Sequence, residues 1–226
     1  MMKNYFYLIF TGVFFITTSV VAQIHESGGH SMMRVSTKQS DVLKDVKGSP
    51  YLNDDFRYGM ITMEGKEPLR VLMRYDINTE TFEIKTEQTS EDIFILPLDL
   101  ETRYHLDTKT FNYRTINFEG DEITGYFQTH FEGENVSLLE KPSLTFIEAE
   151  KARTGYDEDR PGKIKLNNDF FLVFEDGKVE NVKLKERDFE KAFSSSKKAE
   201  KYLSDNKLKT AEDFVEMLEW YDSQVK

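Results

Sequence analysis

The sequence predicts an α+β protein dominated by β-structure. We expect an antiparallel meander sheet, curved or rolled into a half-barrel, with two or three short C-terminal helices packed on it. Apolar and polar residues alternate with a period of two in successive runs, and short turn signals separate these runs at fairly even intervals. From residue 186 onward the apolar spacing changes to three and four, which predicts the helices.

The opening strands of the sheet show the clearest alternation. In residues 68–75 the odd-numbered positions are apolar, whereas Arg70 and Arg74 fall on the opposite face. The runs 56–63 and 81–85 flank this strand and are joined to it by tight turns. We therefore expect three consecutive antiparallel strands with one apolar face, which is about the minimum for a sheet that is stable in water.

Further strands follow at short intervals. The unbroken apolar run 170–174 predicts a strand covered on both faces. Residues 136–149 are expected to hold two short strands separated at Pro142, because proline cannot donate to a central ladder. A polar loop is expected over 151–163. The remaining predicted strands span residues 93–98, 103–106, 110–118, 122–131 and 179–184.

The helical region, residues 186–226, carries both a start signal and an apolar stripe. Thr210 followed by Asp213 resembles a capping box, which marks the start of a helix. Because both faces of the strand at 170–174 need cover, we expect the helices to dock on the sheet. The stripe of the last helix consists of Phe214, Met217, Leu218 and Tyr221.

Residues 1–22 resemble a secretory signal peptide. Lys3 precedes an apolar run over 5–21 that ends in small residues up to Ala22. We expect cleavage after Ala22 and export to the periplasm or the extracellular space. The alternative is an uncleaved membrane anchor, although the run is short for a span. The sequence contains no cysteine, so we expect neither a disulfide nor a lipoprotein, and no stable membrane insertion after cleavage.

Two parts of the mature chain are expected. Residues 23–47 show little periodicity and predict a flexible N-terminal segment, and residues 48–226 predict a single β-rich domain that ends in the helices. The net charge of −11 disfavours phosphate backbones and anionic lipid, so we do not expect the protein to bind nucleic acid. These features leave the oligomeric state open.

One metal site is suggested by the predicted cleavage. If the chain begins at Gln23 with a free amine, His25 is its third residue. The amine, two backbone amides and the imidazole then supply a square-planar nitrogen site for Cu(II) or Ni(II). Cyclisation of Gln23 would consume the amine, and His25 would then be an ordinary solvated histidine. Further candidate copper ligands nearby are His30, Met32 and Met33.

A set of strand and turn residues near the start of the domain occurs together with a lysine-rich helical tail. The residues are Tyr51, Leu52, Phe56, Gly59, Arg74, Tyr75 and Asp76, and the tail ends at Trp220, Tyr221 and Asp222. With these residues, most of the segment 48–222 resembles a family of exported bacterial proteins of unknown function, commonest in Bacteroidetes-type Gram-negative bacteria. The resemblance implies no catalytic or binding residues.

The sequence shows no motif for nucleophilic, phosphate or zinc chemistry, and we assign no catalytic residue and no cofactor. His105 and His130 lie in strand-like runs and are interpreted as core or surface residues. We expect an exported, non-enzymatic binding or scaffolding module whose partner is a protein, a glycan or an apolar ligand. One alternative is a carrier that shelters an apolar ligand in a curved sheet. Another is a hydrolase that uses a carboxylate pair.

Overall fold

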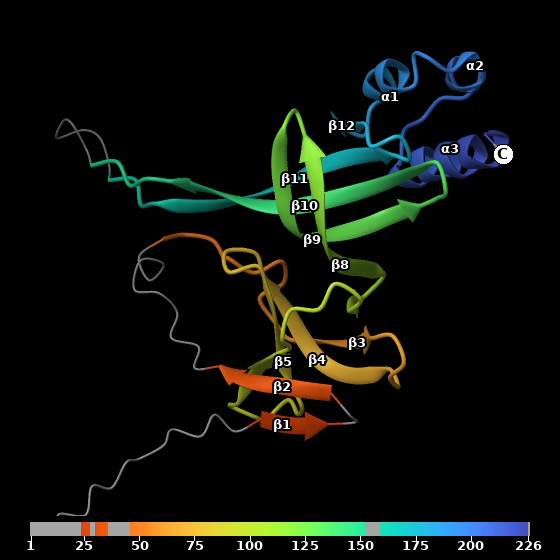
Figure 1. Ribbon diagram of the computed structural model, residues 1–226. Coiled ribbons are helices and arrows are strands. Elements are labelled where there is room, and N and C mark those ends of the chain that lie inside the picture. Colours follow the sequence, from red (N-terminus) through yellow and green to blue (C-terminus); the bar gives the residue numbers. More distant parts are fainter. Residues whose placement is uncertain (1–23, 28–29, 36–45, 152–158, 226) are drawn as a thin grey trace, which may run out of the picture.

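The structure is a computed structural model that describes residues 24–27, 30–35, 46–151 and 159–225. The predicted signal peptide, residues 1–22, lies outside the described residues. The described chain forms a twelve-stranded antiparallel sheet and three helices, which confirms the predicted α+β class (Figure 1). The strands are β1 (Ile24–Ser27), β2 (His30–Val35), β3 (Arg57–Thr62), β4 (Leu69–Asp76), β5 (Thr81–Lys85), β6 (Ile93–Ile95), β7 (Arg103–Leu106), β8 (Lys109–Phe118), β9 (Asp121–Glu132), β10 (Val136–Ile147), β11 (Lys163–Phe174) and β12 (Val179–Val182). The helices are α1 (Glu186–Ala192), α2 (Lys197–Asp205) and α3 (Ala211–Gln224).

The strand order combines two meanders. Across the sheet the order is β1-β2-β6-β5-β4-β3-β7-β8-β9-β10-β11-β12. Strands β3 to β6 form one meander and β7 to β12 form the other, and the two join where β3 pairs with β7. The sheet is open, with β1 and β12 as its edge strands. The predicted meander is therefore confirmed, but after β6 the chain returns to the other side of β3 instead of extending the first meander.

Two strands lie in the segment 23–47, for which the sequence predicted a flexible chain. β1 and β2 pair with each other, and β2 also pairs with β6. Neither strand shows in the sequence pattern, because a strand of four to six residues depends on the backbone of its partner more than on its own apolar pattern. At the end of the segment, Lys47 forms an isolated parallel bridge with Lys163 of β11.

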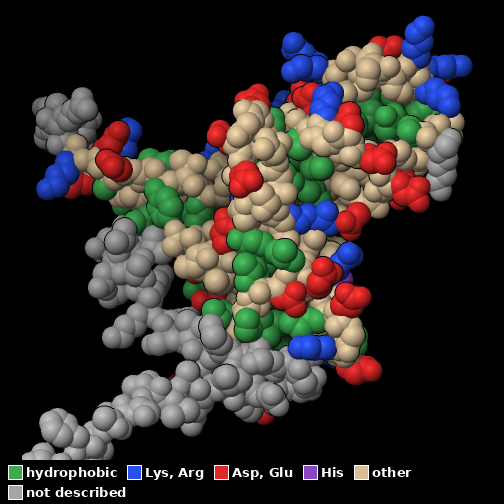
Figure 2. All heavy atoms as spheres, viewed as in Figure 1, with side chains coloured by type: hydrophobic (Ala, Val, Ile, Leu, Met, Phe, Trp, Pro, Cys, Tyr) green, Lys and Arg blue, Asp and Glu red, His purple; other side chains and the backbone are tan. Residues whose placement is uncertain are grey.

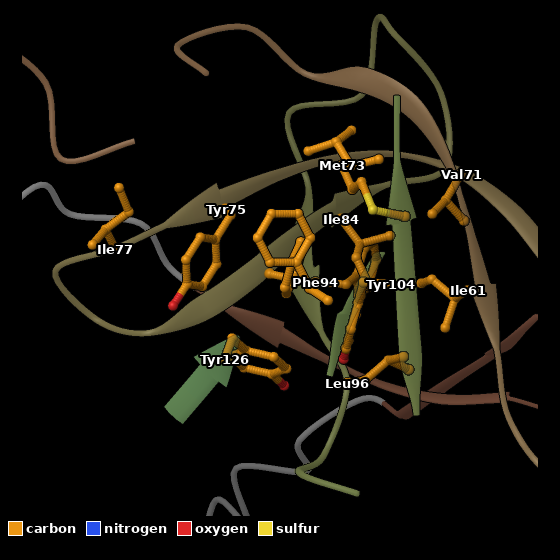
Figure 3. Packing of buried hydrophobic residues seen from close by; sticks show 13 residues of the cluster. Ile61, Val71, Met73, Tyr75, Ile77, Ile84, Phe94, Leu96, Tyr104 and Tyr126 are labelled. Atoms are coloured by element: carbon orange, nitrogen blue, oxygen red, sulfur yellow. The ribbon is translucent and has the colours of Figure 1, made fainter. Parts of the chain in front are cut away.

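One face of the sheet buries a cluster of aromatic rings (Figure 3). Tyr75 on β4 stacks on Phe82 of β5 at 4.8 Å between ring centroids, and Phe82 stacks on Tyr104 of β7 at 4.1 Å. Tyr126 on β9 meets Tyr75 edge-on at 5.8 Å. Because three strands separate β9 from β4 in the sheet, this contact requires the sheet to curl around the rings. The predicted curvature is confirmed.

The helices cover the C-terminal part of the sheet, as predicted. Leu138 on β10 and Leu172 on β11 share a buried cluster with Phe189 of α1 and Leu218 of α3. Phe171 faces the other way, into a third cluster formed by strands β8 to β11, so both faces of this strand are covered. Along the described chain, no helix combines the length and the apolar character that a membrane crossing needs.

Strand β10 corrects the prediction of two strands broken at Pro142. The strand is continuous through Pro142, which pairs with Asn168 of β11. Proline interrupts the pairing of β10 with β9 and not its pairing with β11. The β9–β10 ladder ends at Glu140, two residues before Pro142. Beyond that point β10 and β11 leave the body of the sheet as a two-stranded arm, which we call the ribbon (residues 141–147 and 163–169; Figure 1).

Candidate functional site

The face of β3 that points away from the aromatic cluster carries large exposed side chains. Ile61 is fully buried in the cluster, so strand alternation turns Tyr58 and Met60 to the opposite face. Tyr58 is 62% exposed and Met60 is 43% exposed. Met60 pairs with Arg70 on β4 and with His105 on β7. We call these four residues the outer face.

Arg70 and Tyr58 form an exposed cation–π pair. The Cζ atom of the Arg70 guanidinium lies 4.8 Å from the centroid of the Tyr58 ring. Within the described chain, Arg70 has no carboxylate at ion-pair distance, whereas neighbouring Arg57 is paired with Asp107 at 2.8 Å. A stacked guanidinium without a carboxylate partner retains its N–H donors for a ligand. The outer face therefore offers a held aromatic ring and a local positive charge in an acidic protein.

His105 is held at the centre of the outer face by two hydroxyl groups. Its Nε2 lies 3.1 Å from Oγ1 of Thr62, and its Nδ1 lies 3.1 Å from Oγ1 of Thr110. Burial lowers the pKa of His105, and the nearby charge of Arg103 lowers it further. A neutral imidazole donates from one ring nitrogen and accepts at the other, so both hydroxyl groups are satisfied. His105 thus positions the surface and has no free nitrogen for proton transfer.

Sequence reasoning did not single out the outer face, although a signal for it exists. In an alternating strand with one buried face, the other face is normally polar. Tyr58 and Met60 occupy that other face and break the pattern. Tyr51 and Phe56, two of the residues that carry the resemblance, have a different role: the Cζ atom of Arg74 lies 3.7 and 4.5 Å from the centroids of their rings.

A second polar group lies at a β-bulge between β9 and β10. Leu138 pairs with Phe131 and Leu139 pairs with Thr129, so His130 is the extra residue of β9. A bulge changes the direction of a side chain relative to the ladder. The Nε2 atom of His130 lies 2.6 Å from Oε2 of Glu140.

The bulge group contains a base but no partner for nucleophilic catalysis. Glu140 is 4% exposed, and the ring of His130 lies 5.6 Å from that of Phe170. The side-chain amide of Gln128 lies 3.2 Å from the same imidazole nitrogen. Within the described chain, no hydroxyl group hydrogen-bonds His130, so the nucleophile–base contact of a triad is not formed there. The geometry fits a histidine that gives a buried carboxyl group a hydrogen-bond partner.

The predicted metal ligand, His25, lies in β1 opposite Met32. Gln23, whose amine the predicted site requires, lies outside the described residues. The described residues hold no group of three or more histidine, aspartate or glutamate side chains arranged to bind a metal ion. The copper or nickel site therefore stays a prediction.

Comparison with known proteins finds no match: no protein-family model, no curated protein and no solved structure is significantly similar to this chain. The resemblance to an exported bacterial family is therefore still a prediction.

Proposed function

We propose that this protein is an exported, non-enzymatic binding module that docks a protein partner on its outer face. A single observation carries the proposal. Tyr58 exposes 62% of its surface on a regular strand while its ring is held by the guanidinium of Arg70. An exposed aromatic residue on a rigid strand loses little conformational freedom when a partner covers it.

The composition of the outer face supports a protein partner. Aromatic residues, methionine and arginine are enriched at protein interfaces, and tyrosine and arginine are frequent hot spots. The outer face combines all three types in Tyr58, Met60 and Arg70, which occupy adjacent strands. An acidic partner segment would add an ion pair with Arg70.

The two alternative functions have less support. A carrier needs an unfilled apolar concavity, whereas the aromatic rings on the curled face contact one another, as in the Phe82–Tyr104 stack at 4.1 Å. A hydrolase needs a second catalytic group beside its buried carboxylate. Glu140 is engaged by His130 at 2.6 Å, and within the described chain no second carboxyl group contacts this imidazole.

Site-specific crosslinking tests the proposal. A photo-crosslinking amino acid is placed at Tyr58 or, as a matched aromatic control, at Phe146, which is 49% exposed on the ribbon. In the cell envelope of the native host we expect a crosslink to a different protein from position 58 and none to a different protein from position 146. With the purified partner, Tyr58→Ala should raise Kd about tenfold or more, whereas Phe146→Ala should not change it. Crosslinking to a different protein from position 146 alone, or an unchanged Kd for Tyr58→Ala, would refute the outer face as the docking surface.

A further inference from the structure

Over the ribbon, β10 and β11 pair with each other and with no other strand. β9 stops pairing with β10 at Glu140, and β12 pairs with β11 from Phe170 onward. A sheet of two strands is marginal in water, and the ribbon is supported by the bridge between Lys47 and Lys163 and by Leu144, which packs against the aromatic cluster. It nevertheless exposes Phe146 by 49%, Ile147 by 50% and Leu166 by 41%. Figure 2 shows hydrophobic side chains gathered along this arm.

The direction of the backbone groups on the ribbon follows from one hydrogen bond. The N–H of Ile164 donates to the carbonyl of Lys47 at 2.8 Å, so it points away from β10. The pair Phe146–Ile164 is therefore a non-hydrogen-bonded pair of the ladder. Pairs alternate along an antiparallel ladder, so Leu144–Leu166 and Pro142–Asn168 are of the same type. This is why proline fits at position 142 without loss of a bond to β11.

It follows that Leu144 and Phe146 direct their N–H and C=O groups to the outer edge of β10. No described residue pairs with this edge beyond Glu140. An edge with unpaired backbone groups and apolar side chains is a template for another strand. A strand that pairs antiparallel with this edge of β10 must present the same spacing of outward donors and acceptors.

We propose that the occupant is β10 of a second copy of this chain, paired antiparallel about a two-fold axis at Thr145. Leu144 then faces Phe146 of the second copy, and Phe146 faces Leu144 of the second copy. All four residues point their backbone groups at the interface, so the two pairs exchange about four hydrogen bonds. Thr145 faces its own counterpart as a non-hydrogen-bonded pair.

The neighbouring registers are less favourable. If Leu144 faced its own counterpart, Phe146 would face Pro142, which has no N–H to donate. If Phe146 faced its own counterpart, Leu144 would face the charged Glu148. In the register centred on Thr145, apolar side chains match at both pairs beside the axis, and Pro142 faces Glu148 only at the ends of the paired segment. A two-fold interface of this kind is closed, so it yields a dimer and not a filament.

A cysteine at the two-fold axis tests the proposal, because the chain contains no cysteine of its own. The Cα atoms of a non-hydrogen-bonded pair are about 4.5 Å apart, which is within disulfide range. We expect Thr145→Cys to form a disulfide-linked dimer under mild oxidation. Asn167→Cys is the matched control, since Asn167 donates to Oγ1 of Thr145 at 2.8 Å and either substitution removes the same hydrogen bond. The Asn167→Cys variant should stay monomeric.

Sedimentation velocity provides an independent readout without cysteine. The unmodified protein should show a concentration-dependent dimer, and Phe146→Lys should shift it to monomer with an unchanged circular dichroism spectrum. Lys165→Ala, on strand β11 of the same ribbon, is the control and should leave the dimer intact. If Phe146→Lys fails to fold, Phe146→Pro replaces it, since it removes the outward donor without a loss to β11. A monomeric unmodified protein, or equal oxidation of the two cysteine variants, would overturn the proposal.

Discussion

Glu140 and His130 are joined by a contact of 2.6 Å across the one register shift between β9 and β10. Glu140 is 4% exposed, so its carboxylate is cut off from water on the face that it shares with Phe170. The bulge supplies the imidazole that the buried carboxylate needs, and the β9–β10 ladder ends directly afterwards. The pair thus stabilises the point where the body of the sheet gives way to the ribbon.

Removal of the imidazole should destabilise the protein strongly. His130→Ala leaves the Glu140 carboxylate buried without a partner, which costs about 3 kcal/mol of unfolding free energy. The double variant His130→Ala with Glu140→Gln removes the charge as well and should recover part of the loss. Urea unfolding of the unmodified protein, the two single variants and the double variant measures the coupling energy between His130 and Glu140. A loss below about 0.5 kcal/mol for His130→Ala would show that water reaches the carboxylate.

The helices should prove to be an integral cover of the sheet. Leu218 is fully buried against β10 and β11, so Leu218→Asp places a charge in an apolar cluster and should lower Tm by well over 10 °C. Glu219→Asp, at the exposed neighbouring position of α3, should leave Tm nearly unchanged. Truncation before Glu186 should produce an aggregating or molten protein, as judged by dye binding and loss of a cooperative transition. A cooperative transition at the full-length Tm would instead identify the helices as an independent appendage.

Asp222 should make stability depend on pH. Its burial opposes ionisation, but the backbone N–H groups of Asn135 and Glu134 donate to the carboxylate and lower its pKa below the ordinary value of 3.8. A group with a lowered folded pKa contributes stability above its unfolded pKa, and this contribution is lost as the pH falls through the folded pKa. At pH 7, Asp222→Ala should cost about 1 kcal/mol.

The difference between Asp222→Ala and the unmodified protein should therefore shrink between about pH 4 and pH 2. Denaturant unfolding at several pH values measures it. Glu219→Gln, an exposed carboxylate on the same helix, serves as the control and should show no such convergence. If the stability difference between the two proteins stays constant down to pH 2, the charge of Asp222 does not contribute to the contact between α3 and the β9–β10 turn.

Export should remove residues 1–22. The apolar run 5–21 and the small residues before Gln23 carry this prediction. Intact-mass measurement on the protein recovered from the periplasm or the medium should give a chain that begins at Gln23. A full-length mass in that fraction would contradict it.

Copper binding should depend on the mature N-terminus. A chain that begins with an uncyclised Gln23 should bind about one Cu(II) in a square-planar site with visible d–d absorption, and His25→Ala should abolish it. The site uses the backbone amides of residues 24 and 25, which lie in β1, where His25 pairs with Met32, so copper should weaken the β1–β2 pairing. Amide exchange of this strand pair with and without copper measures that effect. Binding by the His25→Ala variant at equal strength would place the metal elsewhere.

Features set by near neighbours in the chain could be predicted from the sequence. Alternation located β4, and the capping box of Thr210 and Asp213 marked the start of α3, where both of its hydrogen bonds are present. The unbroken run in β11 correctly indicated cover on both faces. Such signals are readable because side-chain direction along a strand and the first turn of a helix depend only on residues a few positions apart.

Pairing between distant residues was decided by the tertiary structure alone. The return of the chain from β6 to the far side of β3 brought Met60 beside His105, and the stacking of Arg70 on Tyr58 depends on the register between β3 and β4. The sequence predicted that Pro142 breaks the strand. In the structure β10 continues through Pro142 in its ladder with β11, and only its ladder with β9 ends before the proline. A bulge such as that at His130 adds one residue to a ladder without a pattern of its own. Register is a relation between two strands, so neither strand encodes it separately.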